Sequence, residues 1–318
     1  MNGRCRPRRL TVWRSSCCGL NKARGVKGNM RYGKKWTPWA FAAPALLVFI
    51  FIVIIPILWT IMLSFQDWNG ITATKWIGIQ NYLKLFSDRT FNKAFWNNLK
   101  FVAISTSYQL SLGIILAVIL SSIPKGRNLF KVMYFVPCII STVAIAQIFI
   151  KFLALQPMGV INIVFQAIGI KPKSWLGTSS TALATLALVD GYKYCGIYMV
   201  ILYSGLTSIS QEVVEAAYID GCGWFKQHLY IKLPMIKGVF GVVLVMLISG
   251  TLKSFEMPYV LTNGGPGTAS EMIATYMYKT AFLTMRYGYS SAMAVFLMVE
   301  CLIGVRLVKL FTSKSNVE

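Results

Sequence analysis

No charged side chain occurs between Trp39 and Gln66, and most residues in this stretch are apolar. A helix needs about 20 such residues to cross the hydrocarbon of a bilayer. The whole chain of 318 residues is 56% hydrophobic and only 13% charged, with a mean hydropathy of +0.59. Soluble domains carry about a quarter of charged residues. These features predict an all-α integral membrane protein.

Further apolar stretches of sufficient length follow the first one, with polar segments between them. We expect six transmembrane helices, at about residues 38–65, 97–121, 130–152, 180–206, 234–256 and 287–310. The segment Ile161–Ile168 is expected to form a short interfacial helix in the loop after the third span. A polar break at 207–233 separates the fourth span from the fifth.

Lysine and arginine residues concentrate in loops and tails, and this predicts the orientation of the chain. Residues 1–35 carry eleven of them and no acidic residue, which places the N-terminus in the cytoplasm by the positive-inside rule. Six spans then put both termini and the break at 207–233 on the cytoplasmic side of the cell membrane. The formal net charge of +22 follows from this pattern and predicts no nucleic-acid partner.

The basic segment 1–35 has two interpretations. It is a cytoplasmic tail, or residues 1–29 are an over-extended start and translation begins at Met30. We favour the second interpretation, because Met30 opens an ordinary basic lead into a membrane helix. The membrane domain is expected over residues 36–312, and a short cytoplasmic tail over 313–318.

The break at 207–233 reads as a short helix, a glycine corner and a second short helix. Ser208 or Ser210 is expected to cap the first helix with its hydroxyl oxygen. Glu215 lies near the start of this helix, where the helix dipole favours a negative charge. Gly221 is suited to the left-handed conformation that ends a helix, and Pro234 to the first turn of the next one.

The same break resembles the signature loop of the membrane subunits of binding-protein-dependent ABC importers. That loop has Glu-Ala-Ala, three residues, Gly, nine residues and Ile-x-Leu-Pro, and the spacing here matches without a gap. The resemblance implies a cytoplasmic coupling helix that docks into the ATP-hydrolysing subunit. The residues it assigns to this contact are Glu215, Ala216, Ala217, Asp220, Gly221, Ile231, Leu233 and Pro234. The less specific interpretation is an amphipathic helix at the membrane interface.

The resemblance extends over about residues 36–310. The segments Ala43–Leu47, Ser64–Trp68 and Gly78–Tyr82 are similar to sugar-importer permeases, and Tyr259–Gly267 resembles an outer loop of the maltose-type first permease subunit. One departure is Cys222, where the family more often has alanine. The chain is therefore identified as similar to the permease subunit of a carbohydrate ABC importer.

That resemblance implies a set of partners. We expect a second homologous permease subunit, two ATP-binding subunits, an extracytoplasmic solute-binding protein, a sugar or sugar-derived substrate, and membrane lipid. ATP and Mg²⁺ would be bound by the partner subunits, and this chain would bind no cofactor. It would form the translocation pathway and switch between inward-open and outward-open states by rigid-body rocking.

The sequence shows no catalytic or metal-binding motif. It contains no GxxxxGK[ST] phosphate loop, no HExxH and no GxSxG. A single histidine, His228, does not build a metal site, and we expect it at a surface or interface. Seven cysteines lack the spacing of a disulfide framework or a zinc site. The chain is not expected to be an enzyme.

Charged residues inside apolar stretches are candidates for the substrate pathway, because charges there are costly and often functional. Asp190 and Lys193 lie on one face of the fourth span, and Tyr192 or Tyr194 would line the pathway with them. The alternative is a neutralising pair buried between helices. Glu300 is expected to pair with a cation or to lie toward the inner end of the sixth span.

Two further features leave alternatives open. Lys253 and Glu256, at the outer end of the fifth span, are expected to form an interfacial pair. Gly264, Gly265 and Pro266 form a turn by their chemistry, and they either contact a partner at the outer face or form a plain tight turn. An ion-coupled secondary transporter is the alternative function, and a membrane-bound enzyme lacks a visible constellation.

Overall fold

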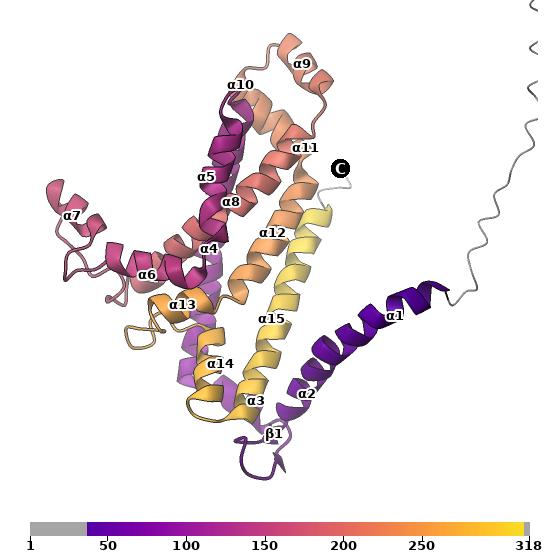
Figure 1. The fold of residues 1–318 in the computed structure, drawn as a ribbon, viewed down its shortest axis with the longest axis vertical. Coiled ribbons are helices and arrows are strands. Elements are labelled where there is room, and N and C mark those ends of the chain that lie inside the picture. Colours follow the sequence, from indigo (N-terminus) through magenta and orange to yellow (C-terminus); the bar gives the residue numbers. More distant parts are fainter. Residues whose placement is uncertain (1–36, 315–318) are drawn as a thin grey trace, which may run out of the picture. The chain divides into compact units, whose positions relative to one another are not determined.

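The computed structural model describes residues 37–314. The expectations for residues 1–35 lie outside the described residues. The chain divides into two compact units at the Ile55–Pro56 junction. Of the first unit, the structure describes α1 (Thr37–Phe49) and the π-helical turn η1 (Ile50–Ile54), which lead into α2 (Ile55–Leu63) (Figure 1).

The second unit is helical apart from one short antiparallel pair, β1 (Gln66–Asp67) with β2 (Lys75–Trp76), in which Gln66 faces Trp76. Its helices up to the polar break are α3 (Gln80–Ser87), α4 (Arg89–Ser122), α5 (Arg127–Ile139), α6 (Thr142–Phe152), α7 (Val160–Ala167) and α8 (Ala182–Thr207). From the polar break onward they are α9 (Gln211–Ile219), α10 (Trp224–Lys226), η2 (Gln227–Lys232), α11 (Leu233–Met235), α12 (Lys237–Leu252), α13 (Glu256–Leu261), α14 (Ile273–Phe282) and α15 (Tyr287–Lys314). The short helix expected at Ile161–Ile168 is present as α7.

Within residues 37–314, four helical segments are long and apolar enough to cross a membrane. They are Phe41–Leu63, Arg89–Ser122, Ala182–Thr207 and Tyr287–Leu310. Two bent helix pairs raise the number to six if each pair is one span. The structure therefore confirms an all-α protein with four to six candidate spans.

The third expected span, 130–152, is not one straight helix. It consists of α5 and α6, which meet at an angle of 95° around Ile140 and Ser141. The fifth candidate span is also broken, because the helical stretch Trp224–Met235 turns by 72° into α12. An unbroken run of apolar residues does not reveal such breaks, since each half keeps the same composition.

Both π-helical turns lie just before a proline. η1 ends at Ile54, two residues before Pro56, and η2 ends at Lys232, two residues before Pro234. A proline lacks the N–H that the carbonyl four residues earlier needs, and its ring crowds that carbonyl. The residue preceding each proline instead bonds five residues back, Ile55 to Ile50 and Leu233 to His228. The widened turn thus lets the helix continue into the proline.

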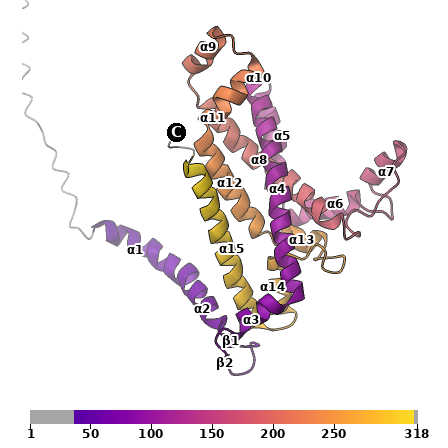
Figure 2. The ribbon, with the colours of Figure 1, turned by 180° about the vertical axis from the view of Figure 1, so that it is seen from behind.

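Helix α8 is the most enclosed candidate span. Its apolar window is 67% buried, against 22% for α4 and 28% for α15. Figures 1 and 2 show α8 beside α4 and α5 on one side and beside α12 on the other. Two glycines permit this proximity, because an added Cβ at Gly191 would clash with Tyr108 of α4, and one at Gly196 with the Tyr134 carbonyl of α5.

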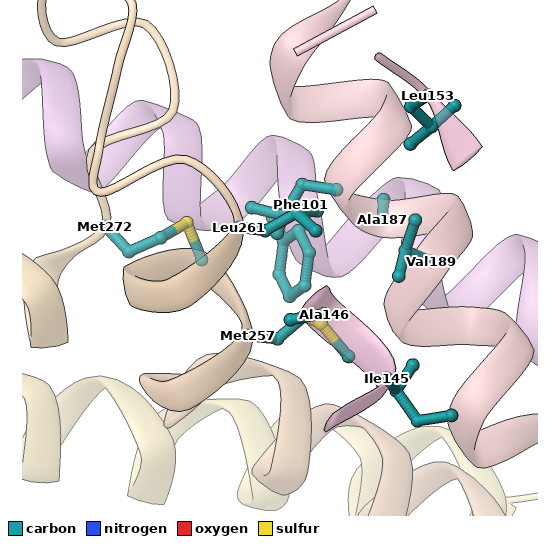
Figure 3. Packing of buried hydrophobic residues seen from close by; sticks show 10 residues of the cluster. Phe101, Ile145, Ala146, Leu153, Ala187, Val189, Met257, Leu261 and Met272 are labelled. Atoms are coloured by element: carbon teal, nitrogen blue, oxygen red, sulfur yellow. The ribbon is translucent and has the colours of Figure 1, made fainter. Parts of the chain in front are cut away.

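The buried apolar side chains form three clusters along the second unit. The cluster in Figure 3 joins α4, α6, α8 and α13 through residues such as Phe101, Ile145, Val189 and Met257. A second cluster joins α4, α8 and α12 toward the polar break, and a third joins α3, α4, α14 and α15. Helix α4 therefore contributes to all three clusters, and α8 to two of them.

Asp88 links three helices at the end of the unit opposite the polar break. One carboxylate oxygen accepts from the backbone N–H groups of Thr90 and Phe91 and so caps α4. The other accepts the hydroxyls of Tyr276 in α14, at 2.6 Å, and Tyr289 in α15, at 2.8 Å. Burial by itself would raise the pKa of the Asp88 carboxyl, but these hydrogen bonds together lower it.

We predict that Asp88 stabilises the fold in a pH-dependent way. Asp88→Ala removes the cap of α4 and both tyrosine contacts. A lost cap lowers the free energy of unfolding by about 1 kcal/mol, and for a chain of this size Tm then falls by about 2–4 °C. Asp88→Asn keeps a capping oxygen and should lie between the wild type and Asp88→Ala. The measurement is thermal unfolding in detergent across pH.

The sign of the pH effect follows from the lowered pKa. The unfolded carboxyl, near 3.8, takes up its proton at a higher pH than the folded one. The advantage of the wild type over Asp88→Asn should therefore be complete above that value and disappear as the pH falls through the lower folded pKa. An advantage that grows on acidification would contradict this role of Asp88.

Candidate functional site: a protruding loop and a cavity between helices

The polar break folds as a helix and a second helical stretch joined by a glycine corner, as expected. Helix α9 begins after Ser210, which occupies the N-cap position but makes no side-chain capping bond. Ser208 donates its hydroxyl to the carbonyl of Gly205 and belongs to the end of α8. The prediction of a serine side-chain cap was therefore wrong, because the Ser208 hydroxyl bonds within α8 and the Ser210 hydroxyl makes no capping bond.

The glycine corner is confirmed at Gly221, which has a φ of +76°. The N–H of Gly221 donates to the Tyr218 carbonyl, and the N–H of Cys222 donates to the Ala217 carbonyl, each at 3.0 Å. These two bonds are the Schellman motif that closes a helix C-terminus. The departure at Cys222 leaves this corner intact.

The residues assigned to an ATPase contact differ in exposure. Glu215, Ala216, Asp220, Gly221 and Pro234 are exposed. Ile231 and Leu233 are half-buried, and Ala217 is buried at 5% exposure. Ala217 therefore packs inside the loop and does not lie on its outer surface.

Large apolar side chains cover the outside of the loop, and the sequence analysis did not single them out. Tyr218 is 78% exposed, Ile219 83% and Phe225 68%. Figure 1 shows α9 at the tip of the second unit, beyond the ends of α8 and α12. An exposed apolar patch at the tip of a polar loop is typical of a surface that binds another protein.

Side-chain contacts hold the second half of the loop in place. Gln227 donates to the Val214 carbonyl at 3.0 Å, and Trp224 Nε1 donates to Ser122 Oγ of α4 at 2.9 Å. His228 is buried, 2.8 Å from the Trp224 carbonyl and 3.4 Å from Ser121 Oγ. His228 is thus an internal contact between the loop and α4, and of the two expected positions, surface or interface, the surface one was wrong.

A cavity of about 490 Å³ lies between α4, α6, α8, α12 and the start of α13. Its lining combines polar groups with aromatic rings. The lining residues are Gln109, Thr142, Asp190, Tyr194, Tyr198, Gly250, Thr251, Lys253, Ser254, Phe255, Glu256 and Met257. Two of the three residues expected along a substrate pathway, Asp190 and Tyr194, therefore line one cavity.

Asp190 lies deep in the fold, with only 2% of its surface exposed. At 1.5 Å per residue it is about 12 Å along α8 from Ala182, well inside the depth of a bilayer's hydrocarbon. Its Oδ2 accepts a hydrogen bond from Gln109 Nε2 of α4 at 3.1 Å. The partner Gln109 was missed in the sequence, although an amide in an apolar stretch is itself a signal.

Lys193, the third expected pathway residue, does not line this cavity. It is 3% exposed, and its ammonium donates to the Ile140 carbonyl at 2.6 Å. Ile140 ends α5 at the 95° break before α6, so Lys193 places a positive charge at a helix C-terminus. The structure therefore gives Lys193 a contact that holds the break, and Asp190 and Lys193 form no ion pair.

The other charged residues also differ from expectation. Lys253 and Glu256 both line the cavity and make no ion pair, since the one pair among the described side chains joins Lys279 and Glu271. Glu300 accepts a hydrogen bond from Asn98 of α4 at 3.4 Å and is not paired with a cation.

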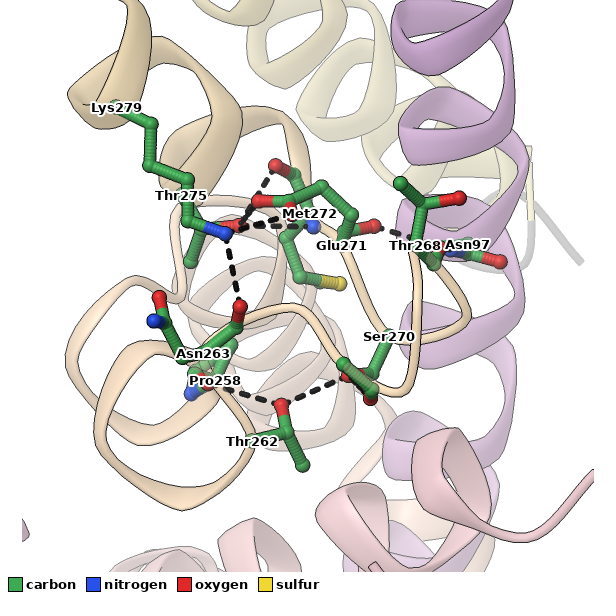
Figure 4. Close-up of polar contacts among 11 residues, drawn as sticks. Asn97, Pro258, Thr262, Asn263, Thr268, Ser270, Glu271, Met272, Thr275 and Lys279 are labelled. Carbon is green, nitrogen blue, oxygen red and sulfur yellow. Dashed lines mark hydrogen bonds and ion pairs between the residues drawn. The ribbon is translucent and has the colours of Figure 1, made fainter. Parts of the chain in front are cut away.

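The loop between α13 and α14 is organised by Glu271, which is 3% exposed. As Figure 4 shows, the Glu271 carboxylate accepts hydrogen bonds from the Lys279 ammonium at 2.8 Å and from the Thr275 hydroxyl at 2.7 Å. The Glu271 backbone carbonyl accepts a hydrogen bond from the Asn97 amide of α4 at 3.1 Å. Lys279 also donates to the Asn263 carbonyl at 2.8 Å. The loop is therefore attached to both α4 and α14.

Gly264 has a role inside this network. It is buried, with a φ of +77°, and an added Cβ would clash with the Glu271 carboxylate. Gly265 and Pro266 are half-buried. The outer-face contact predicted for these three residues stays a prediction.

The comparisons with known proteins agree with this geometry. Residues 109–316 match the family described as binding-protein-dependent transport system inner membrane component, and the chain belongs to this family. The probable ABC transporter permease protein YurN of Bacillus subtilis is 36% identical over 83% of this chain and 92% of its own length. The arabinooligosaccharides transport system permease protein AraP of the same organism is 30% identical, over 89% and 90%.

A solved structure has the same fold. It is a bacterial alginate ABC transporter in complex with an alginate pentasaccharide-bound periplasmic protein. One of its chains superposes with a TM-score of 0.77 at 22% identity, over 88% of this chain and 94% of that one. At this identity the likeness establishes the fold of the present chain.

We predict that Gly264→Ala destabilises the outer loop more than Gly267→Ala does. Both glycines have positive φ, so both variants incur the left-handed penalty of about 1–2 kcal/mol. Only Gly264 has a neighbour that a Cβ would meet, because nothing lies within 4 Å of the Cβ position at Gly267. Thermal unfolding of the two variants measures the difference, and equal Tm values would contradict the packing of Glu271 against Gly264.

A second prediction concerns Lys193. Lys193→Met removes the charged donor of the Ile140 carbonyl. A hydrogen bond to a charged group contributes about 1.5–3 kcal/mol, and Tm falls by about 2–4 °C for each kcal/mol lost. Lys193→Arg keeps a donor and should lose less. Lys151→Met, at an exposed position near the end of α6, is the control and should leave Tm unchanged. A Lys193→Met variant as stable as this control would contradict the capping role.

Proposed function

We propose that this chain is the permease subunit of an ABC importer that moves a sugar or sugar derivative across the cell membrane. The proposal rests on the loop at 207–233, in which Gly221 ends α9 and apolar side chains are exposed. The chain that contains this loop belongs to the transport-system family. The relatives AraP of Bacillus subtilis and the trehalose/maltose permease MalF of Thermococcus litoralis are carbohydrate permeases by name.

The proposed layout has six spans, with each bent helix pair counted as one. Both termini and the polar break then lie in the cytoplasm, an orientation that the eleven lysine and arginine residues of segment 1–35 support. Helices α7, α13 and α14 lie on the extracytoplasmic side in this arrangement. The four continuous candidate spans and the two bent pairs support it.

The energy source in this proposal is a separate ATPase. Tyr218, Ile219 and Phe225 form an apolar docking surface, and Glu215 adds a negative charge beside it. ATP and Mg²⁺ would be bound by two such partner subunits, and this chain would bind neither. Loop movement would reach α8 and α12 through the chain itself and α4 through the Trp224–Ser122 bond.

The proposed substrate route passes through the cavity lined by Asp190 and Tyr194. A volume of about 490 Å³ is within the usual range of about 300–1,000 Å³ for small-molecule sites. A second homologous permease would complete the pathway, and an extracytoplasmic solute-binding protein would deliver the substrate. The bacterial alginate transporter with the same fold is in complex with a periplasmic protein, which supports this last partner.

The test is co-purification of the tagged chain from its own cells in mild detergent. We predict that the wild type retains an ATP-binding subunit and a second permease. Glu215→Lys reverses a charge at the docking surface, and Gly221→Pro cannot adopt the φ of +76°. Both variants should lose the ATPase and keep the second permease, because the contacts inside the membrane are unchanged.

The matched control is Glu212→Lys, which reverses an exposed acid in the first turn of α9, outside the matched motif. It should retain the ATPase. A wild-type chain that purifies alone and still transports solute in liposomes would refute the proposal in favour of an ion-coupled carrier.

A further inference from the structure

We infer that a groove between the start of α12 and the end of α15 binds an anionic phospholipid. Lys237 and Lys309 hold the phosphate of the lipid, and apolar side chains of α12 contact the first part of an acyl chain. The inference goes beyond the proposed function and takes from it only the side of the membrane. In the proposed layout the lipid belongs to the cytoplasmic leaflet.

The groove lies where α12 and α15 run side by side near the polar break, as Figures 1 and 2 show. Its volume is about 310 Å³. Gly241 allows the two helices to approach, because an added Cβ there would lie 3.3 Å from Thr312. Nothing lies within 4 Å of the Cβ position at Gly238, which also lines the groove. The groove is therefore open beside Gly238 and closed by packing below it.

The two lysines that line the groove have no acidic partner among residues 37–314. The one ion pair between described side chains involves neither Lys237 nor Lys309. The sequence has no acidic residue between Asp220 and Glu256, and the one acid of α15, Glu300, lies more than two helical turns before Lys309. Two ammonium groups at one groove repel each other. An anion that binds between them removes this repulsion.

The groove changes from charged to apolar along α12. Val242, Val245 and Met246 line it beyond Lys237, and Val242 and Met246 are exposed. Val245 lies about 12 Å from Lys237 along the helix, at 1.5 Å per residue. Lys309 stands near the end of the apolar segment Tyr287–Leu310. The lysines are thus at the edge of the hydrocarbon and the apolar lining is inside it, which is the polarity of a phospholipid.

Charge selects among the phospholipids. Basic pockets between transmembrane helices on the cytoplasmic side are suited to anionic headgroups. A lysine ammonium binds phosphate as a compact charge. A choline or ethanolamine headgroup brings a cation beside Lys237 and Lys309, and such a like charge disfavours the ligand.

The apolar part of the groove distinguishes a lipid from other occupants. Free phosphate satisfies the lysines but leaves the exposed Val242 and Met246 without contacts. A soluble ATPase does not enter the hydrocarbon, where these two side chains lie. An anionic glycerophospholipid matches both the charged and the apolar part.

The first experiment is photolabelling of the complete complex in nanodiscs. The probes are phosphatidylglycerol and phosphatidylcholine, each with a diazirine in the acyl chain close to the glycerol. Peptide mass spectrometry measures the labelling of residues 242–246. Each lysine near the surface favours the anionic lipid by about fivefold, corresponding to about 1 kcal/mol. We expect the anionic probe to exceed the zwitterionic one by about 5- to 25-fold, and a ratio near one overturns the inference.

Two double variants separate a site from a basic surface. Lys237→Gln with Lys309→Gln should lower the ratio to about one. Lys125→Gln with Lys226→Gln is the matched control, because it removes the same charge at exposed positions outside the groove. The control should keep the wild-type ratio. An equal fall in both double variants overturns the inference, because the attraction then belongs to the basic surface as a whole.

Gly238→Leu tests the groove without changing any charge. The leucine side chain fills the open space beside Gly238, and its Cβ meets no neighbour within 4 Å. Labelling of residues 242–246 by the anionic probe should fall at least about fivefold, the contribution of one lysine contact, while Tm in lipid-free detergent stays at the wild-type value. Unchanged labelling overturns the inference.

Competition distinguishes a lipid from its headgroup. Inorganic phosphate and glycerol phosphate are added at an ionic strength held constant with chloride, because salt screens exposed charges. Neither should reduce the labelling. Loss of labelling with either one overturns the inference in favour of a soluble phosphate. An anionic preference in the isolated chain that is absent from the complete complex also overturns it, because a partner subunit then covers the groove.

These outcomes are separate from those of the proposed function, because photolabelling requires no ATP. A chain that co-purifies with an ATPase but shows no anionic preference keeps the importer proposal and loses the lipid site. A chain that shows the preference but has no ATPase partner keeps the lipid site and loses the importer proposal.

Discussion

Close packing of α8 against its neighbours is the constraint on which the rest of the structure depends. In lipid the hydrophobic effect does not drive helices together, so association relies on close backbone approach and on polar contacts between helices. Gly191 and Gly196 let α4 and α5 approach α8, and Asp190 and Lys193 on the same helix bond to Gln109 and to the Ile140 carbonyl. One helix thus supplies the packing surface, a wall of the cavity and the contact that holds a neighbouring break.

The polar break connects these packed helices to the surface proposed to bind a partner protein. The Schellman corner at Gly221 fixes how α9 ends, and the π-helical turn before Pro234 lets the helix continue through this proline to the 72° bend that precedes α12. The Trp224–Ser122 bond joins the loop to α4. A force applied at Tyr218 and Ile219 would therefore act on three of the helices around the cavity, which is the mechanical requirement of the proposed function.

Much of this was accessible from the sequence, and the exceptions have physical reasons. Uncharged apolar runs specify membrane helices. The chemistry of glycine predicted the corner at Gly221, and that of proline predicted the position of Pro234 in the first turn of a helix, here α11. The break between α5 and α6 was missed, because both halves are equally apolar and the contact made at the break comes from Lys193, which is distant in sequence from Ile140. The contribution of Gln109 and Glu256 to the cavity was missed for the same reason. Lining residues come from several helices, and only tertiary packing brings them together.

The central claim is that the exposed tip of α9 contacts a separate ATPase. The most direct measurement is photo-cross-linking in intact cells from a benzophenone amino acid at Tyr218, with the same group at Trp76 in β2 as the control. The account predicts a protein adduct at Tyr218 that contains an ATP-binding subunit, and no such adduct at Trp76. An ATPase adduct at Trp76, or only lipid adducts at Tyr218, would contradict the claim.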